Sequence, residues 1–121
     1  MERCRSLGYE VALVYVALDG PDLNVRRVAE RVSRGGHNIP ETVIRRRYEK
    51  AFLRLPTAVA LSHTSLFLDN SSLQPQMLLI IDRGRIVANH LDVANSMHTR
   101  LARTVGTAIG LNANAVLHRG R

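Results

Sequence analysis

The run of ten residues from Tyr9 to Leu18, YEVALVYVAL, most constrains what this chain can fold into. It is almost continuously apolar and rich in β-branched and aromatic residues, a pattern typical of a strand covered on both faces in a parallel sheet. The strand ends at Asp19-Gly20-Pro21, and Asp22 can cap a helix that follows. The sequence therefore predicts that the chain opens with a buried strand and then a helix.

Turn residues and hydrophobic spacing place the later elements in a regular order. We expect helices at 22–34 and 40–55, a strand at 66–68, a hairpin of 77–81 with 85–88, and a helix from 91 to 109 followed by a loosely held tail. Strand, helix, loop, helix, strand is the order of part of an α/β sheet. The sequence thus predicts an α/β sheet with crossover helices, followed by a β-hairpin and a C-terminal helix.

Positive charge is concentrated in about a quarter of the chain. The formal net charge is +7. Residues 22–54 carry nine basic side chains and four acidic ones, so that +5 of the +7 lies there. Apart from Lys50, every basic residue in the chain is an arginine. This charge favours anionic partners, but its sign does not separate nucleic acid from nucleotide phosphates or an acidic protein.

Three of these arginines are spaced as on one face of a helix. Arg27, Arg31 and Arg34 follow i, i+4, i+7 spacing opposite a valine stripe. Gly35-Gly36 then forms a hinge before a second helix that carries the run 45–47 of three arginines. Such a pair of helices could close over a polyphosphate, with guanidinium groups on its oxygens. The alternative interpretation is a solvated pair of basic helices.

The same arginines belong to a longer motif. It consists of RVAERVSRGGHNIP at 27–40, IRRRY at 44–48 and LDNS at 68–71. This pattern resembles the zeta toxin family of P-loop kinases, which includes bacterial proteins labelled predicted ABC-type ATPases. The resemblance extends from Gly8 to Val87, about 80 of the 121 residues. Its most specific part is the Gly-Gly-His-x-Ile-Pro element flanked by arginines.

The resemblance implies a P-loop kinase-like three-layer sheet, with ATP and Mg²⁺ as cofactors and UDP-N-acetylglucosamine as a candidate acceptor. Residues 1–90 would be the C-terminal half of the kinase domain, with an arginine-rich lid at 22–54, and residues 91–121 a C-terminal helix and tail. In the family, two lid arginines contact the phosphates of ATP. The resemblance makes Arg31 and Arg34 the first lid candidates, then Arg46 and Arg47, with Arg27, His37, Asp69 and Asn70 as secondary candidates.

Other parts of the family's machinery are missing from these 121 residues. The family carries a Gly-x-x-x-x-Gly-Lys-Ser/Thr loop and an acidic residue proposed to deprotonate the acceptor hydroxyl. Lys50 has no glycine-rich loop around it, and we assign no catalytic residue. We expect kinase activity only if an N-terminal half with that loop completes the enzyme. The chain would then be a fragment, a truncated product, a misassigned start or half of a split enzyme, among which the sequence does not choose.

Partners follow from the charge and from the predicted strand. We expect nucleotide phosphates in the lid, and an N-terminal half, an antitoxin or a second copy along an exposed edge of the sheet. A nucleic-acid-binding or protein-interaction module derived from a degenerate kinase is the alternative. Nucleic acid is disfavoured because the five aromatic residues form no stacking platform.

Other functional classes have little support in the sequence. The single cysteine, Cys4, excludes an intrachain disulfide and is consistent with a reducing compartment. The five histidines lack the spacing of metal ligands, so no metal site is expected. Without an apolar run of membrane-spanning or signal-peptide length, we expect a cytoplasmic protein that does not enter a membrane.

Overall fold

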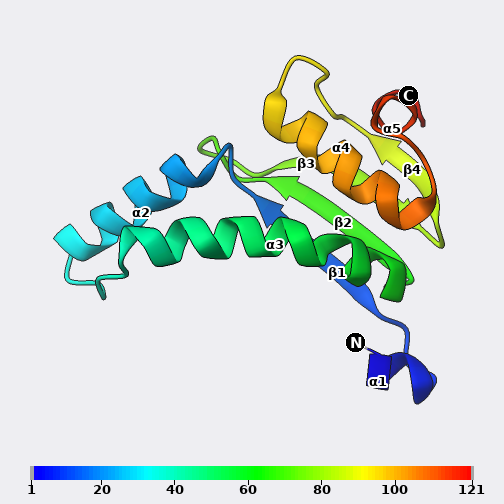
Figure 1. The fold of residues 1–121 in the computed structure, drawn as a ribbon, viewed down its shortest axis with the longest axis horizontal. Coiled ribbons are helices and arrows are strands. Elements are labelled where there is room, and N and C mark those ends of the chain that lie inside the picture. Colours follow the sequence, from blue (N-terminus) through cyan, green and yellow to red (C-terminus); the bar gives the residue numbers. More distant parts are fainter. Residues whose placement is uncertain (1, 121) are drawn as a thin grey trace.

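The computed structural model describes residues 2–120, which form a four-stranded mixed sheet and five helices (Figure 1). The strands are β1 (Ala12–Ala17), β2 (Thr64–Asp69), β3 (Gln76–Asp82) and β4 (Arg85–Asn89). The helices are α1 (Glu2–Ser6), α2 (Pro21–Ser33), α3 (Glu41–Leu61), α4 (Ser96–Ile109) and α5 (Ala113–His118). The predicted α/β fold, with its β-hairpin and its C-terminal helix, is confirmed at this level.

The sheet has the order β1-β2-β3-β4. β1 and β2 are parallel, with Tyr15 opposite Phe67, and α2 and α3 provide the crossover between them. β3 and β4 are antiparallel neighbours, joined by a turn at Arg83 and Gly84 in which both residues have positive φ (48° and 78°). Two consecutive left-handed residues are characteristic of the tight hairpin turn whose twist matches that of the strands.

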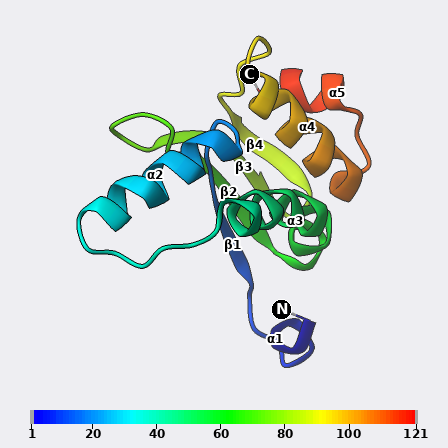
Figure 2. The same ribbon diagram turned by 60° about the vertical axis from the view of Figure 1, so that its left-hand side comes forward.

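The hydrophobic core lies between one face of the sheet and helices α3, α4 and α5 (Figures 1 and 2). Phe67 and Leu79 of the sheet, and Leu101 and Val105 of α4, are fully buried. α3 packs against α4 and contributes Phe52, Leu55 and Val59 to the same core. As the spacing of its apolar residues predicts, α4 covers the sheet with one apolar stripe.

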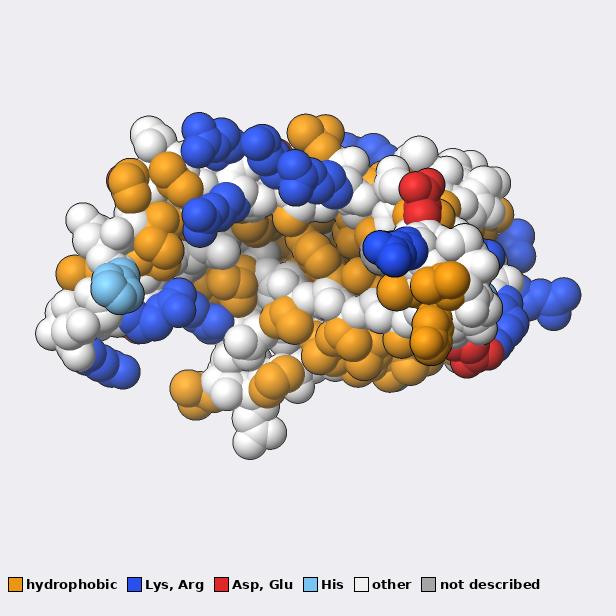
Figure 3. All heavy atoms as spheres, turned by 90° about the horizontal axis from the view of Figure 1, so that it is seen from below, with side chains coloured by type: hydrophobic (Ala, Val, Ile, Leu, Met, Phe, Trp, Pro, Cys, Tyr) orange, Lys and Arg blue, Asp and Glu red, His pale blue; other side chains and the backbone are white. Residues whose placement is uncertain are grey.

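The opposite face of the sheet is not covered by any helix within residues 2–120, which corrects the expectation that the first strand is buried on both faces. Side chains alternate along β1, so that Tyr15 points into the core while Val14 and Val16 point outward and remain 60% and 52% exposed. Val87 of β4 is 57% exposed. Figure 3 shows hydrophobic side chains gathered on the surface of the molecule. Two layers are therefore present in the described chain where three were expected.

The C-terminal segment also differs from the loosely held tail that we expected. Val116 and Leu117 of α5 are 0% and 7% exposed, because they pack into the core beside α4. The buried amide of Asn89 donates hydrogen bonds to the carbonyl oxygens of Val116 at 2.7 Å and Arg119 at 2.8 Å. A polar side chain at the end of β4 thus holds the last helix, a role that periodicity alone does not reveal.

Two helix starts differ from the sequence prediction. Asp22 does not cap α2, because Gly20, which has no side chain, occupies the cap position. Asp22 lies in the first turn of the helix and forms an ion pair with Arg45 of α3 at 2.6 Å. α4 begins at Ser96 rather than near Leu91, because the side chain of Asn95 accepts hydrogen bonds from the backbone at the helix N-terminus. Such a cap satisfies amide groups that the first turn leaves without partners.

Candidate cavity between α2 and α3

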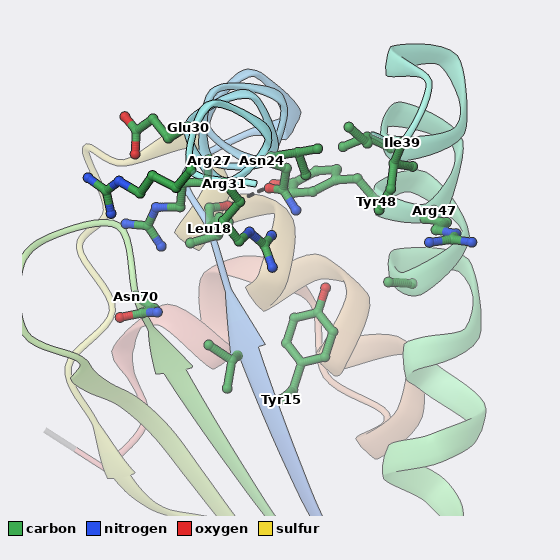
Figure 4. A pocket seen from close by; sticks show the side chains of 15 residues that line it. Tyr15, Leu18, Asn24, Arg27, Glu30, Arg31, Ile39, Arg47, Tyr48 and Asn70 are labelled. Atoms are coloured by element: carbon green, nitrogen blue, oxygen red, sulfur yellow. Dashed lines mark hydrogen bonds between the residues drawn. The ribbon is translucent and has the colours of Figure 1, made fainter. Parts of the chain in front are cut away.

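A cavity of about 690 Å³ lies between α2, α3 and the C-terminal end of β1 (Figure 4). α2 contributes Asn24, Arg27 and Arg31, and α3 contributes Arg47 and Tyr48 on the other wall. The remaining lining side chains come from the sheet, the loops and the two helices: Tyr15, Val16, Leu18, Val28, Glu30, Arg34, Ile39, Ile44, Ala51 and Asn70. The site therefore lies beyond the carboxyl ends of the parallel strands, where open α/β sheets bind ligands.

Four arginines line this cavity, and they include the predicted helical face. Arg27, Arg31 and Arg34 reach it from α2 and the residue that ends α2, and Arg47 reaches it from α3. Within residues 2–120, none of these four forms an ion pair or a side-chain hydrogen bond. Glu30 is the one acidic residue among those that line the cavity. The cavity is therefore strongly electropositive.

Arg45 lies on α3 between Ile44 and Arg47, which line the cavity, but it has a different role. Its guanidinium group bonds Asp22 at 2.6 Å and Glu41 at 2.8 Å, and so ties the start of α2 to the start of α3. The hydrogen bonds that Arg45 donates to these two carboxylates raise its pKa above the usual range. All three side chains are well exposed, so these two ion pairs contribute little to the free energy of unfolding and mainly orient the two helices.

Tyr48 fixes the position of α3 relative to the start of α2. Its hydroxyl donates a hydrogen bond to the carbonyl oxygen of Leu18 at 3.0 Å and accepts one from the N–H of Gly20 at 3.2 Å. Burial raises the pKa of this phenol, although the hydrogen bond from Gly20 and the charge of Arg100 oppose the shift. Tyr48 therefore remains a neutral hydrogen-bonding group near neutral pH.

Tyr15 and Asn24 contribute polar groups that the sequence did not point to. Burial raises the pKa of Tyr15 to about 12, and the nearby phenol of Tyr48 adds to the shift. The Oδ1 atom of Asn24 is buried and has no hydrogen-bond partner among the described residues. Asn24 precedes Arg27 by three residues and Arg31 by seven, so helical spacing could have included it. The position of Tyr15 on the cavity could not be predicted, because it lies in a run of apolar residues that gives no indication of a polar site.

The structure brings together some of the predicted site residues and separates others. Asn70 lies on the cavity with Arg27, Arg31, Arg34 and Arg47. Arg46 is exposed and does not line the cavity, because adjacent residues on a helix point about 100° apart. His37 is exposed in the loop between α2 and α3 and also lies outside the lining.

Asp69 does not line the cavity, because it is held in a buried hydrogen-bond network. Its carboxylate accepts bonds from the N–H and hydroxyl of Ser71, and lies 3.2 Å from Nε2 of His98. Nδ1 of His98 accepts a hydrogen bond from the N–H of Asp92, which places the proton of the neutral ring on Nε2. Burial opposes ionisation of Asp69, but the bonds from Ser71 and His98 outweigh it and lower its pKa. This carboxylate therefore has a structural role.

Residues 2–120 contain neither a metal-binding cluster nor a membrane-spanning helix. No group of three or more histidine, cysteine, aspartate or glutamate side chains is arranged to hold a metal ion. No helix is long and apolar enough to cross a membrane.

Comparison with protein families, with curated proteins and with solved structures gave no match to this chain.

Proposed function

We propose that the cavity between α2 and α3 binds the polyphosphate of a nucleotide, and that this chain is the lid-bearing portion of an ATP-dependent small-molecule kinase of the zeta toxin type. The observation that carries the proposal is the convergence of four arginines without ion pairs on one cavity. A cluster of this kind, from two helices joined by a loop, matches the arrangement expected of a phosphate lid.

The chemistry of these side chains suits phosphate oxygens. A guanidinium group offers parallel N–H donors that bind two oxygens of one phosphate, and several such groups can contact successive phosphates. Tyr15 and Asn24 add a hydroxyl and an amide at the floor and on one wall. Because Arg31, Arg34 and Arg47 are exposed, ions in solution screen them, and the binding should weaken as salt is added.

The donor set fits the phosphates of ATP but not Mg²⁺. Glu30 is the one carboxylate on the cavity, and residues 2–120 contain no cluster of carboxylates that could hold a metal. In the complete enzyme, Mg²⁺ would neutralise charge on the β- and γ-phosphates. We assign no residue of this chain to that ion and no residue to proton transfer. We therefore expect these 121 residues to bind the nucleotide without turning it over.

Fluorescence anisotropy with a labelled ATP analogue tests the proposal. Arg31→Ala combined with Arg47→Ala should abolish binding, because it removes one guanidinium group from each wall. Arg46→Ala combined with Arg54→Ala is the matched control, since it also removes two positive charges, both from exposed positions of α3 outside the cavity. Tripolyphosphate should compete and adenosine should not. Equal loss of affinity in the two double variants would show that net charge, rather than the cavity, holds the anion.

A second candidate function rests on the outer side of α3. Arg46, Lys50 and Arg54 are exposed at i, i+4, i+8 spacing, and form a basic stripe away from the cavity. A stripe of this kind can follow the phosphates of a nucleic acid. A triple variant with alanine at these three positions should lose binding to a labelled single-stranded oligonucleotide if this function holds, and should leave binding of the ATP analogue unchanged.

A further inference from the structure

The outer edge of β1 is open along the strand. The carbonyl oxygens of Val11 and Ala17 accept hydrogen bonds from residues at the two ends of β2, so the odd-numbered residues of this segment face β2. Backbone groups alternate in direction along a strand, and the N–H and C=O groups facing away from β2 are those of Ala12, Val14 and Val16. Within residues 2–120, no strand pairs with this side.

This edge lacks the features that usually protect an open strand. Ala12–Ala17 contains no charge and no proline, and the side chains of Val14 and Val16 are more than half exposed. Protein edges are normally blunted by lysine, proline, a bulge or a covering element. An unprotected edge beside an apolar sheet face is a surface on which another strand can pair.

The edge leads directly into the arginine cavity. Val16 and Tyr15 belong both to β1 and to the cavity lining, while α2 and α3 enclose this end of the strand on two sides (Figure 4). The enclosed space lies beside one strand edge and is bounded by Arg31 and Arg47. This arrangement favours a single extended chain over a second packed sheet, because the two helices already occupy the flanking space.

We propose that an extended acidic segment of a partner protein binds along β1 as a fifth strand, with its carboxylates on Arg27, Arg31 and Arg47. Addition of a strand supplies main-chain hydrogen bonds at the edge, and the pockets next to it supply specificity. Charge complementarity selects the acidic partner, since one carboxylate and four arginines line the cavity that the segment would enter.

This inference goes beyond the proposed nucleotide function, because the edge of β1 takes no part in binding phosphates. The segment and a nucleotide would share the arginines, so each should displace the other. A partner with this chemistry would thus regulate access to the cavity. Loss of nucleotide binding alone would leave the strand-addition proposal intact.

Fluorescein-labelled nonapeptides can serve as the probe. Two test peptides contain alternating threonine and valine, with three glutamates at the N-terminal end of one and at the C-terminal end of the other. Two control peptides have the same sequences with lysine in place of each glutamate. In the protein, Val14→Pro removes an N–H that points away from the sheet, so it blocks strand addition without breaking an internal bond. Val14→Thr is the matched control, because it keeps both that N–H and a β-branched side chain.

We expect one of the glutamate peptides to bind and the lysine peptides to bind at least about tenfold more weakly, a difference of 1.4 kcal/mol. Val14→Pro should weaken the binding by a similar factor, while Val14→Thr should not. Far-UV circular dichroism and a cooperative transition in chemical denaturation will show that Val14→Pro is folded, a check that does not depend on nucleotide binding. In the wild-type protein, the peptide should also slow hydrogen exchange at Ala12, Val14 and Val16, a readout that does not depend on the variant.

Three results would overturn the proposal. Equal binding of the glutamate and lysine peptides would exclude the acidic partner, and equal binding by wild type and Val14→Pro would exclude the strand edge. Sedimentation that shows a dimer of wild type and a monomer of Val14→Pro would make a second copy of the chain the occupant instead.

Discussion

Tyr48 on α3 donates a hydrogen bond to the carbonyl oxygen of Leu18, which directly follows β1, at 3.0 Å. The same hydroxyl accepts a bond from Gly20 in the turn that leads into α2. The ring also packs against Phe52, with 5.4 Å between the ring centroids. One side chain thus connects β1, the start of α2 and α3, which together form the walls of the cavity.

Replacement of Tyr48 by phenylalanine should lower the free energy of unfolding by about 1–3 kcal/mol, because it removes two hydrogen bonds, to Leu18 and from Gly20, each with a net value of roughly 0.5–1.5 kcal/mol. Affinity for the ATP analogue should fall as well, because the two arginine-bearing helices lose a fixed relative position. Chemical denaturation and anisotropy measure the two effects. Tyr9→Phe is the control, since Tyr9 is 65% exposed. An unchanged affinity in Tyr48→Phe would contradict a positioning role.

Alkaline pH should destabilise the protein through Tyr15. Burial holds the pKa of this phenol near 12 in the folded state, compared with 10.0 for an ordinary tyrosine. The neutral phenol is thus favoured in the folded protein, and its contribution to stability is complete below pH 10 and is lost as the pH rises towards 12. Denaturation at pH 9 to 12 should show a smaller decline for Tyr15→Phe than for wild type. Parallel declines would show that Tyr15 is accessible to water.

Most of the fold could be predicted from local patterns. The β3-β4 hairpin was predictable because Gly84 provides the positive φ that its tight turn requires. The Arg27, Arg31 and Arg34 face was predictable because helical spacing depends on sequence alone. The open face of β1 was not, because the apolar run gives no sign of whether a helix covers Val14 and Val16. Burial on the second face depends on tertiary packing.

The limits of the site prediction have a similar origin. Which of two adjacent arginines enters the cavity depends on the rotation of α3 about its axis, which follows from the burial of its apolar face, Ile44 to Val59, together with the bond from Tyr48 to Leu18. Arg47 therefore faces the cavity and Arg46 does not. Asp69 ends a strand, a position that ligand-binding residues often occupy. Its structural role depends on the contact with His98, which lies 29 residues further along the chain and could not be paired with Asp69 from the sequence.

Removal of the Asp69 carboxylate should destabilise the protein by about 2 kcal/mol, because partly buried donors on Ser71 and a buried donor on His98 then lose their acceptor. Asp69→Ala tests this in chemical denaturation. Asp19→Ala is the control, since Asp19 is exposed and has no side-chain bond among the described residues, while its backbone N–H still reaches Ser71. Equal stability of the two variants would contradict a structural role for Asp69.

The same carboxylate should make the protein sensitive to acid. Because hydrogen bonds lower the pKa of Asp69 below 3.8 in the folded state, its contribution to stability is present above that pH. The contribution is lost as the pH falls through the lowered folded-state value. The stability of Asp69→Asn should therefore fall less steeply than that of wild type below pH 4. Identical acid profiles would mean that the carboxylate is not preferentially ionised in the folded protein.

Gly106 in α4 should be intolerant of even a methyl group. A Cβ at this position would lie 2.3 Å from the carbonyl oxygen of Leu111 and 3.3 Å from a methyl group of Val116. The residue is buried where α4 meets the turn into α5, and the N–H of Leu111 donates a hydrogen bond to its carbonyl oxygen at 3.0 Å.

In an open helix, glycine to alanine would be stabilising, because alanine loses less backbone entropy on folding. At Gly106 the backbone of Leu111 cannot move aside without displacing α5, so Gly106→Ala should instead cost about 1–3 kcal/mol, as overpacking usually does. Thr107→Ala, next along the helix and exposed, is the matched control and should change stability by no more than about 0.5 kcal/mol. If Gly106→Ala proves as stable as wild type in chemical denaturation, the close contact between α4 and the turn before α5 is not formed in solution.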